Sequence, residues 1–279
     1  MLRTTAKLLG VACLALAAPA VVSATEPNLT VTIAGRTTTY APASLLGMPA
    51  ATSVTIPDDV AYKREMSFRA VPAASLLTGV APDDTLRFVA SDGFVATIPA
   101  ALLLARGGAV AYLAIEPVDA QWPPLKPEGG ASAGPFYLVW LNPERSHVTP
   151  EQWPYQIARI EDVLPLIKRY PMLAPAASAH DAVRRGYAVF EKNCSVCHTL
   201  NLGGDATVGP DLNVPYNPTE YMRIDALRRL IRNPQALRRW PAAKMPAFEP
   251  RLLSDRDLTD LLAYLRHMAD RKVTVPALK

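Results

Sequence analysis

The spacing of hydrophobic residues along the chain differs between its first and second parts. Between residues 28 and 160, apolar and polar positions alternate in short runs, as where Leu29, Val31 and Ile33 alternate with threonines. A period of two is typical of half-buried β-strands. From residue 181 onward, apolar positions recur three and four residues apart, which is the period of an amphipathic helix. The pattern therefore predicts an N-terminal α+β domain followed by an all-α domain.

Turn signals separate the alternating runs of the first part into strands. Ala34-Gly35-Arg36 turns one hairpin over residues 28–40, and Asp92-Gly93 turns a second over 85–98. Residues 136–141 are apolar on both faces, which predicts a central buried strand. The other predicted elements are strands at 52–56, 110–115 and 155–160, short helices at 42–47, 71–79 and 99–104, and a Pro/Gly-rich loop at 121–134.

The second part is predicted to contain three helices. One begins at Asp181, and another over 219–232 ends before Asn233-Pro234, because a residue that precedes proline disfavours the helical conformation. The last begins at Ser254, with Asp257 in capping-box spacing and a stripe of inward leucines. The domains are therefore predicted as 25–170 and 181–279, joined by a Pro/Ala-rich linker over 171–180.

Length, composition and charge agree with two globular domains. The chain has 279 residues, of which 50% are hydrophobic, and this is sufficient for two cores. Its net charge of +4 does not indicate a nucleic-acid-binding protein. Residues 25–178 hold 11 basic and 14 acidic residues, whereas 179–279 hold 16 basic and 11 acidic. An acidic domain is thus joined to a basic one.

The first 24 residues have the pattern of a secretory signal peptide. Arg3 and Lys7 precede an apolar run over 8–22, and small residues lead to a cleavage site after Ala24. A retained membrane anchor is the first alternative, although the run is shorter than the roughly 20 residues that span a bilayer. Lipoprotein cleavage at Cys13 is the second. Export through this signal predicts a periplasmic protein.

The clearest chemical signal is Cys194-Ser195-Val196-Cys197-His198. A C-x-x-C-H run is the attachment signature of a c-type haem: both thiols become thioethers to one porphyrin, and the histidine ligates the iron. The alternatives are a thioredoxin-like redox pair, half of a zinc site, or chance. A redox pair is expected next to a βαβ pattern, and a zinc site needs two more ligands nearby. The sequence around the motif offers neither.

Five motifs in order make residues 181–272 resemble a class I cytochrome c domain. Gly186-Tyr187-Ala188-Val189-Phe190 precedes the C-x-x-C-H run; Gly209-Pro210-Asp211-Leu212, Lys244-Met245-Pro246-Ala247-Phe248, Leu252-Leu253-Ser254-Asp255 and the last helix follow it. The resemblance implies one covalent haem c with His198 as proximal ligand. It also implies that the Pro210 carbonyl orients His198 and that Met245 is the distal ligand.

The first part resembles the molybdopterin-binding fold of the sulfite-oxidase-like superfamily over residues 28–163. The resemblance is carried by Phe68-Arg69-Ala70-Val71-Pro72, Arg87-Phe88-Val89-Ala90-Ser91-Asp92-Gly93-Phe94, Ala96-Thr97-Ile98-Pro99, Gly134-Pro135-Phe136-Tyr137-Leu138-Val139 and Gln156-Ile157-Ala158-Arg159-Ile160-Glu161. The enzymes of that superfamily bind molybdenum through a cysteine thiolate, and residues 25–178 contain no cysteine. The domain is therefore predicted to lack molybdenum.

These observations predict a periplasmic monohaem cytochrome that carries single electrons, with the N-terminal domain docking a dehydrogenase or terminal oxidase. An electron-transfer protein is favoured over a catalyst. The alternative is a haem subunit of a molybdenum-type, sulfite-dehydrogenase-like enzyme with its own redox centre. A haem-based sensor would need an open distal site, which the Met-Pro motif disfavours.

Six arginines between the haem motif and Met245 form a candidate docking surface for the redox partner. They are Arg223, Arg228, Arg229, Arg232, Arg238 and Arg239. No carboxylate follows Asp225 in this run, so the sequence predicts that intrahelical pairing leaves their charge uncompensated. A merely solvated helix face is the alternative. The acidic N-terminal domain and a separate redox enzyme are the two candidate binding surfaces.

Overall fold

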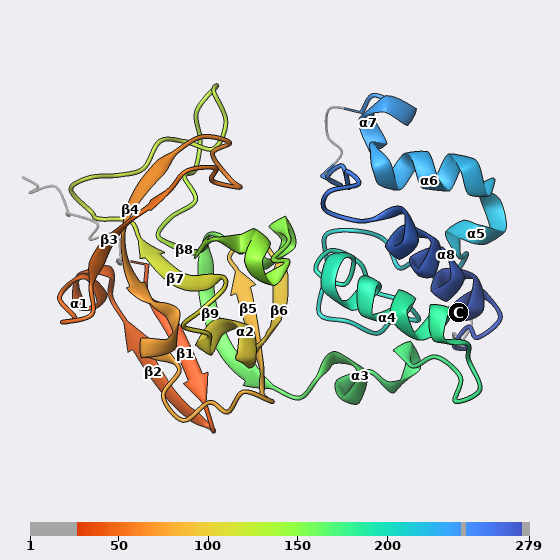
Figure 1. Ribbon diagram of the computed structural model, residues 1–279, viewed down its shortest axis with the longest axis horizontal. Coiled ribbons are helices and arrows are strands. Elements are labelled where there is room, and N and C mark those ends of the chain that lie inside the picture. The colour runs from red at the N-terminus through yellow and green to blue at the C-terminus, as the bar shows by residue number, and fades with distance from the viewer. Residues whose placement is uncertain (1–26, 241–243, 275–279) are drawn as a thin grey trace, which may run out of the picture.

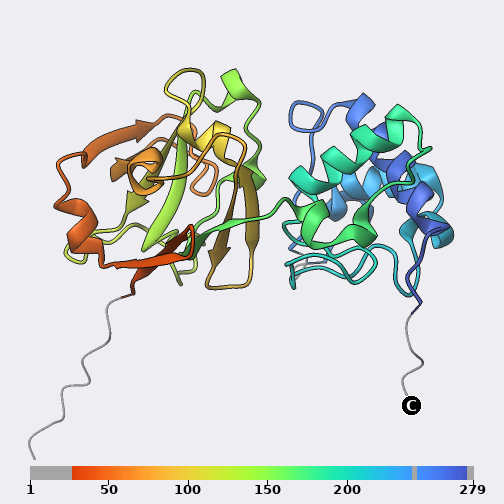
Figure 2. The same ribbon diagram turned by 90° about the horizontal axis from the view of Figure 1, so that it is seen from below.

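The computed structural model describes residues 27–240 and 244–274. Figures 1 and 2 show two bodies: the strands lie in the first and the longer helices in the second, with a single connecting segment between them. Among the helices of the described residues, none is long and apolar enough to cross a membrane. The predicted leader over 1–24 lies outside the described residues.

A five-stranded sheet confirms both predicted hairpins. Its order is β2-β1-β9-β5-β6, and its strands are β1 (Leu29–Ile33), β2 (Arg36–Tyr40), β5 (Thr85–Ala90), β6 (Val95–Pro99) and β9 (Ile157–Val163). Ala34 and Gly35 turn the first hairpin with positive φ of 50° and 73°. β1 runs parallel to β9, and the other neighbours are antiparallel. The first strand of the domain, β1, thus pairs with the last, β9, which is the central strand of this sheet.

A second sheet corrects the prediction that residues 136–141 form a central strand. Its order is β3-β4-β7-β8, from β3 (Thr52–Ile56), β4 (Met66–Pro72), β7 (Val110–Ile115) and β8 (Phe136–Leu141). β8 is buried on both faces as predicted, but it is an edge strand rather than a central one; the amide of Leu138 donates instead to the carbonyl of Pro154 at 3.0 Å. A buried strand can therefore lie at a sheet edge when a loop covers that edge.

The helix predicted over 71–79 is wrong for most of its length. Residues 66–72 form β4, and only the 3₁₀ turn η1 (Ala73–Leu76) follows. Met66, Phe68 and Ala70 are buried while the residues between them are exposed. This alternation against the core outweighs the helix start that Pro72 favours.

The two sheets enclose one core, in which Phe68, Phe88, Phe136 and Trp140 are all at most 2% exposed. Two short helices contribute Leu45 and Leu103 to this core and confirm the predictions at 42–47 and 99–104: α1 (Pro42–Leu46) and α2 (Ala100–Leu104). The first body is therefore a sheet-rich domain built from two sheets.

The second body contains five helices within the described residues: α4 (Asp181–Asn193), α5 (Pro218–Tyr221), α6 (Ile224–Arg232), α7 (Pro234–Leu237) and α8 (Asp255–Ala269). The single helix predicted over 219–232 is broken into α5 and α6, because Met222 and Arg223 are extended. Asn217 and Glu220 form a capping box that starts α5. The predicted end at Arg232 and the Ser254 cap of α8 are confirmed.

Helices α4 and α8 cross at Gly186. A Cβ at this position would lie 2.0 Å from the carbonyl oxygen of Asp260 and 2.7 Å from Cβ of Tyr264. Only glycine allows so close an approach. Arg185 donates to the Asp260 carboxylate at 2.7 Å beside the crossing, while Phe190 and Tyr264 are fully buried inside it. The helix that leads into the haem motif is thereby fixed against α8.

The segment between the bodies packs against the helical one. It contains α3 (Leu166–Arg169) and the 3₁₀ turn η4 (Pro171–Leu173). Leu166 and Leu173 belong to the second hydrophobic core, and the hydroxyl of Tyr264 donates to the carbonyl of Leu173 at 2.8 Å. The first residues of the segment predicted as a linker are therefore part of the helical core.

A partly buried charge network connects the two bodies. Asp205, which follows the haem motif, accepts from Arg87 of β5 at 2.9 Å, from Arg169 of α3 at 2.7 Å and from the hydroxyl of Tyr170 at 2.9 Å. Arg87 also pairs with Glu161 of β9. Burial alone would raise the pKa of Asp205, but the hydrogen bonds from Arg169 and Tyr170 and the two positive charges hold it below its usual value.

Two further contacts join the bodies. Nζ of Lys192, near the end of α4, donates to the carbonyl of His147 at 2.6 Å. The Asp92-Gly93 turn touches the residues after the haem motif, since a Cβ on Gly93 would lie 3.0 Å from Oγ1 of Thr207. The sheet domain therefore contacts the helical domain both before and after Cys194–His198.

We expect Asp205→Asn to loosen the contact between the two domains. The substitution removes the carboxylate that pairs with Arg169 and one of the two that pair with Arg87, which keeps Glu161. This should lower the free energy of unfolding by about 2 kcal/mol and increase the radius of gyration in small-angle X-ray scattering. Because the pKa of Asp205 is lowered on folding, its stabilisation is present above its unfolded pKa of 3.8 and is lost as pH falls below the folded value.

Arg159→Gln is the matched control, because Arg159 pairs with Glu161 from a half-exposed position and does not reach Asp205. Equal stability and equal scattering for the two variants at neutral pH would contradict a role for Asp205 in holding the domains together.

Candidate functional site

The C-x-x-C-H motif begins where α4 ends. Cys194 is the C-cap of α4, and the next turn is closed by hydrogen bonds from the amides of Cys197 and His198 to the carbonyl of Cys194, at 3.1 and 2.9 Å. This turn brings both thiols and the imidazole close together. Cys194, Cys197 and His198 are all only partly covered by protein.

The two thiols do not have the properties of a redox pair. Burial raises the pKa of Cys194 to about 12 and that of Cys197 to about 11. A thioredoxin-like pair needs a lowered pKa so that one sulfur attacks as thiolate. In the part of the chain that the structure describes, no three His, Cys, Asp or Glu side chains gather as a metal-binding group.

His198 is held in one orientation by the loop that follows it. Its Nδ1 lies 2.7 Å from the carbonyl oxygen of Pro210, so Nδ1 carries the proton and Nε2 presents its lone pair. Gly209 lies against the ring: a Cβ there would be 2.6 Å from Cε1 and 2.7 Å from Nδ1 of His198. The amide of Gly209 also donates to the carbonyl of Cys197 at 2.7 Å. The predicted contact between Pro210 and His198 is therefore present.

The protonation of His198 suits a ligand. Burial lowers the pKa of the imidazole, while the Pro210 carbonyl and the charge of Asp211 act in the opposite direction. The net lowering favours the neutral ring, which is the form that binds a metal ion.

Asp211 folds the loop in which Pro210 lies. We call residues 199–217 the proximal loop. Oδ1 of Asp211 accepts from the amides of Asn213 and Val214 at 2.8 and 2.7 Å, and Oδ2 accepts from the amide of Leu202 at 2.7 Å. A single carboxylate thus supplies acceptors for a loop that has little regular secondary structure.

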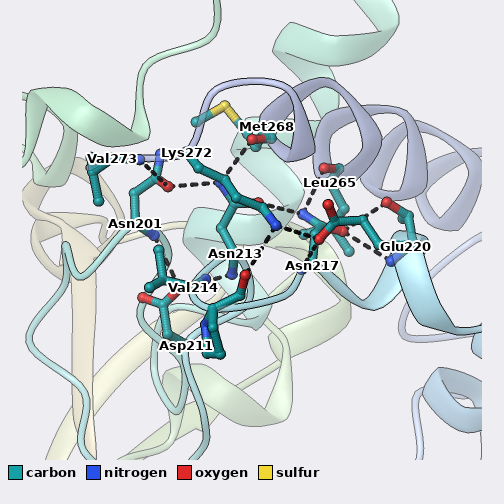
Figure 3. A network of polar contacts seen from close by, with 12 residues as sticks. Asn201, Asp211, Asn213, Val214, Asn217, Glu220, Leu265, Met268, Lys272 and Val273 are labelled. Carbon is teal, nitrogen blue, oxygen red and sulfur yellow. Dashed lines mark hydrogen bonds and ion pairs between the residues drawn. The ribbon is translucent and has the colours of Figure 1, made fainter. Parts of the chain in front are cut away.

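Three buried asparagines attach the proximal loop to the end of α8 (Figure 3). Asn217 donates to the carbonyl of Leu265 at 2.9 Å and to Oδ1 of Asn213 at 2.8 Å. Asn213 donates to Oδ1 of Asn201 and to the carbonyl of Met268, both at 2.7 Å. Asn201 donates to the carbonyl of Arg271 at 2.9 Å. The amides of Asn213 and Asn217 therefore add a second hydrogen bond to carbonyls in the last turns of α8, since the Met268 carbonyl also accepts from the amide of Arg271 at 2.9 Å.

Met245 lies in a second loop, residues 244–253, which we call the methionine loop. Its side chain is partly buried and packs against the hydrophobic core of the helical domain. Other partly buried residues that pack against that core include Cys194, Leu212, Met222 and Leu230. Cys194 and Met245, predicted from separate motifs, thus border one apolar region.

The six arginines of the predicted docking surface differ in exposure and in partners. Arg228 is half-buried and donates to Oγ1 of Thr259 at 2.9 Å. Arg223 and Arg229 are well exposed but both pair with Asp225, at 3.2 Å each, so the prediction that intrahelical pairing leaves them uncompensated is wrong for these two. Arg232 is mostly buried and bonds to the methionine loop and to Asp255. Arg238 and Arg239 are exposed.

The residues that sequence reasoning did not single out are Asn201, Asp205, Asn213 and Asn217. Arg232 was named in the predicted docking surface, but its bonds to the methionine loop were not foreseen. Asn217 had a detectable signal, because Asn217-Pro218-Thr219-Glu220 has the spacing of a capping box. For the others, short polar residues in a loop are the usual composition of a turn, and nothing in the local sequence distinguishes a buried asparagine from a solvated one.

Comparison with known proteins agrees with this geometry. The family model for cytochrome c matches residues 183–269, which include Cys194, Cys197, His198, Pro210 and Met245. The C-terminal part of the chain is a cytochrome c domain, and this implies a covalently bound haem c and a role in electron transfer. A search of curated proteins found no match to the chain.

Proposed function

We propose that this chain is a periplasmic monohaem c-type cytochrome that carries single electrons between redox partner proteins. The observation that carries the proposal is the arrangement of Cys194, Cys197 and His198, with Nδ1 of His198 bonded to Pro210 and Nε2 free to ligate iron. Cys194 and Cys197 would form the two thioethers, and Met245 would be the distal ligand.

Haem supplies one-electron transfer between ferrous and ferric iron when it is bound. The residues present fit the group: two thiols stand beside a neutral, oriented imidazole, and a partly covered apolar border that includes Leu212, Met222 and Met245 suits a porphyrin face. A methionine thioether favours the ferrous state relative to ligation by two nitrogens. The chain would therefore accept electrons at a higher potential than a bis-histidine protein.

For the N-terminal domain we propose a sulfite-oxidase-like fold without molybdenum, acting as a docking module. Its two sheets and the absence of cysteine from residues 25–178 support this assignment. Its contacts through Lys192 and Asp205 place it beside the haem motif. A partner recognised by this domain would be held next to the electron-transfer site.

The periplasmic assignment rests on the leader pattern over residues 1–24 and on the covalent haem. Attachment of haem to C-x-x-C-H takes place outside the cytoplasmic membrane in bacteria, so export of this chain and its cofactor chemistry agree.

A surface around α6 and α7 supports docking of an acidic redox partner. Four arginines, Arg223, Arg229, Arg238 and Arg239, are exposed there together with Ile224 at 39%, Leu237 at 38% and Trp240 at 60%. Arginine and tryptophan are the residue types that dominate binding energy at protein interfaces. No ion pair between described residues joins these arginines to the N-terminal domain, which favours a separate redox enzyme as the partner.

We expect one covalent haem per chain. Haem staining after denaturing electrophoresis should be retained by the wild-type chain and lost in Cys194→Ala/Cys197→Ala. Metal analysis should give one iron per chain and no stoichiometric molybdenum. Retention of covalent haem by the double variant would refute the attachment site, and molybdenum near one per chain with released pterin would favour the sulfite-dehydrogenase-like alternative.

The distal ligand is tested by the sulfur-to-iron charge-transfer band in the far red. We expect Met245→Ala to abolish this band and lower the reduction potential, since it removes the thioether. Met222→Ala is the matched control, because Met222 packs against the same core and is also partly covered. Loss of the band in Met222→Ala and its survival in Met245→Ala would reassign the ligand.

Charge reversal at Arg223, Arg229 and Arg238 should slow electron transfer with the native partner at low salt and flatten its salt dependence. The reason is that steering between opposite charges raises the association rate and is screened over about 8 Å at physiological ionic strength. Arg232 is left intact because it is mostly buried. Arg36→Glu, an exposed arginine of β2, is the control. Unchanged rates at low salt would show that these arginines form a solvated surface without a role in docking.

A further inference from the structure

The methionine loop is attached to the rest of the domain at Phe248. The amide of Phe248 donates to the carbonyl of Ile231 at 3.1 Å, and its side chain is 6% exposed. Pro246 and Ala247, which connect it to Met245, are exposed. Phe248 is therefore the first firmly held residue after Met245.

Arg232 holds this attachment from the end of α6. Its Nη1 donates to the carbonyls of Phe248 at 2.7 Å and Leu253 at 2.5 Å, and its Nη2 donates to the carboxylate of Asp255 at 2.6 Å. The three acceptors lie in the methionine loop and at the first residue of α8. One guanidinium thus connects α6, the loop and α8.

The burial of Arg232 distinguishes it from its neighbours. Its side chain is 20% exposed, whereas that of Arg229, one turn earlier on α6, is 68% exposed and pairs within its own helix. A planar guanidinium can bond to several acceptors at once, and a lysine ammonium cannot reproduce this geometry. Charge-assisted hydrogen bonds in a partly buried place are stronger than neutral ones.

We propose that Arg232 is a positioning residue for the distal ligand: by holding Phe248 and Leu253 it keeps Met245 in place to ligate the iron. This inference rests on the proposed function, in which Met245 is that ligand. Arg232 acts through the loop and does not touch the iron. Its removal should therefore weaken the bond between Met245 and iron in a protein that still contains haem and still folds.

The test uses the haem-containing chain and follows the far-red band while imidazole is added. Imidazole competes with the Met245 thioether, so its apparent affinity reports how firmly the loop holds the ligand. We expect Arg232→Gln to bind imidazole about tenfold or more tightly than the wild-type chain, as the loss of hydrogen bonds from a charged group predicts. Arg229→Gln, from the exposed side of the same helix, should leave imidazole binding unchanged.

Two further variants keep the test decisive if Arg232→Gln does not fold. Arg232→Lys should show an intermediate increase, because a single ammonium cannot bond to all three acceptors. Asp255→Asn removes only the ion pair and should have the smaller effect. Imidazole affinity within twofold of wild type in folded Arg232→Gln, or in Arg232→Lys if only that variant folds, would overturn the proposal.

A failure of the proposed function would look different. A wild-type chain that contains haem but lacks the far-red band would refute Met245 as ligand and the role of Arg232 with it. A normal band in the wild-type chain, lost in Met245→Ala and insensitive to Arg232, would refute the positioning role alone.

Discussion

The arrangement of the cytochrome domain depends on hydrogen bonds between the proximal loop and the end of α8. The loop must present the carbonyl of Pro210 to His198, and it has little secondary structure with which to hold its own backbone. The last turns of α8 offer backbone carbonyls, each of which can accept a second hydrogen bond. Asn213 and Asn217, both fully buried, donate to the carbonyls of Met268 and Leu265 and so hold the loop against the helix. An aliphatic residue at either position would remove a buried hydrogen bond that attaches the loop to α8.

The sequence predicted most elements of the fold and failed where tertiary contacts decide. Alternation and turn signals sufficed for the hairpins of the five-stranded sheet, since register there follows from local pattern. β4 was missed because Pro72 favours a helix start, which the burial of Phe68 overrides. The edge position of β8 depends on a loop that covers it, and no local pattern records such a contact.

The candidate site also has one part that the sequence reveals and another that it does not. Cys194, Cys197 and His198 are adjacent in sequence, so their chemistry can be recognised from spacing alone. The residues that hold them are far apart: Asn213 bonds to Met268, and Arg232 to Leu253. Counting charges along the chain also misjudged Arg232, because its partners come from a loop and from the start of another helix. Sequence identifies groups that react, whereas their supports become visible only in three dimensions.

Both candidate ligand loops are attached to one helix, at opposite ends. The proximal loop bonds to the last turns of α8 through Asn213 and Asn217, while Arg232 connects the methionine loop to Asp255 at its first residue. The 15 residues of α8 span about 22 Å as a rigid rod. Gly186 sets α4, which leads into Cys194, directly against the middle of this rod. A shift of α8 would therefore move both loops together, whereas a change at Arg232 would release only one. For this reason Arg232→Gln should affect the distal ligand while the contact between His198 and Pro210 remains intact.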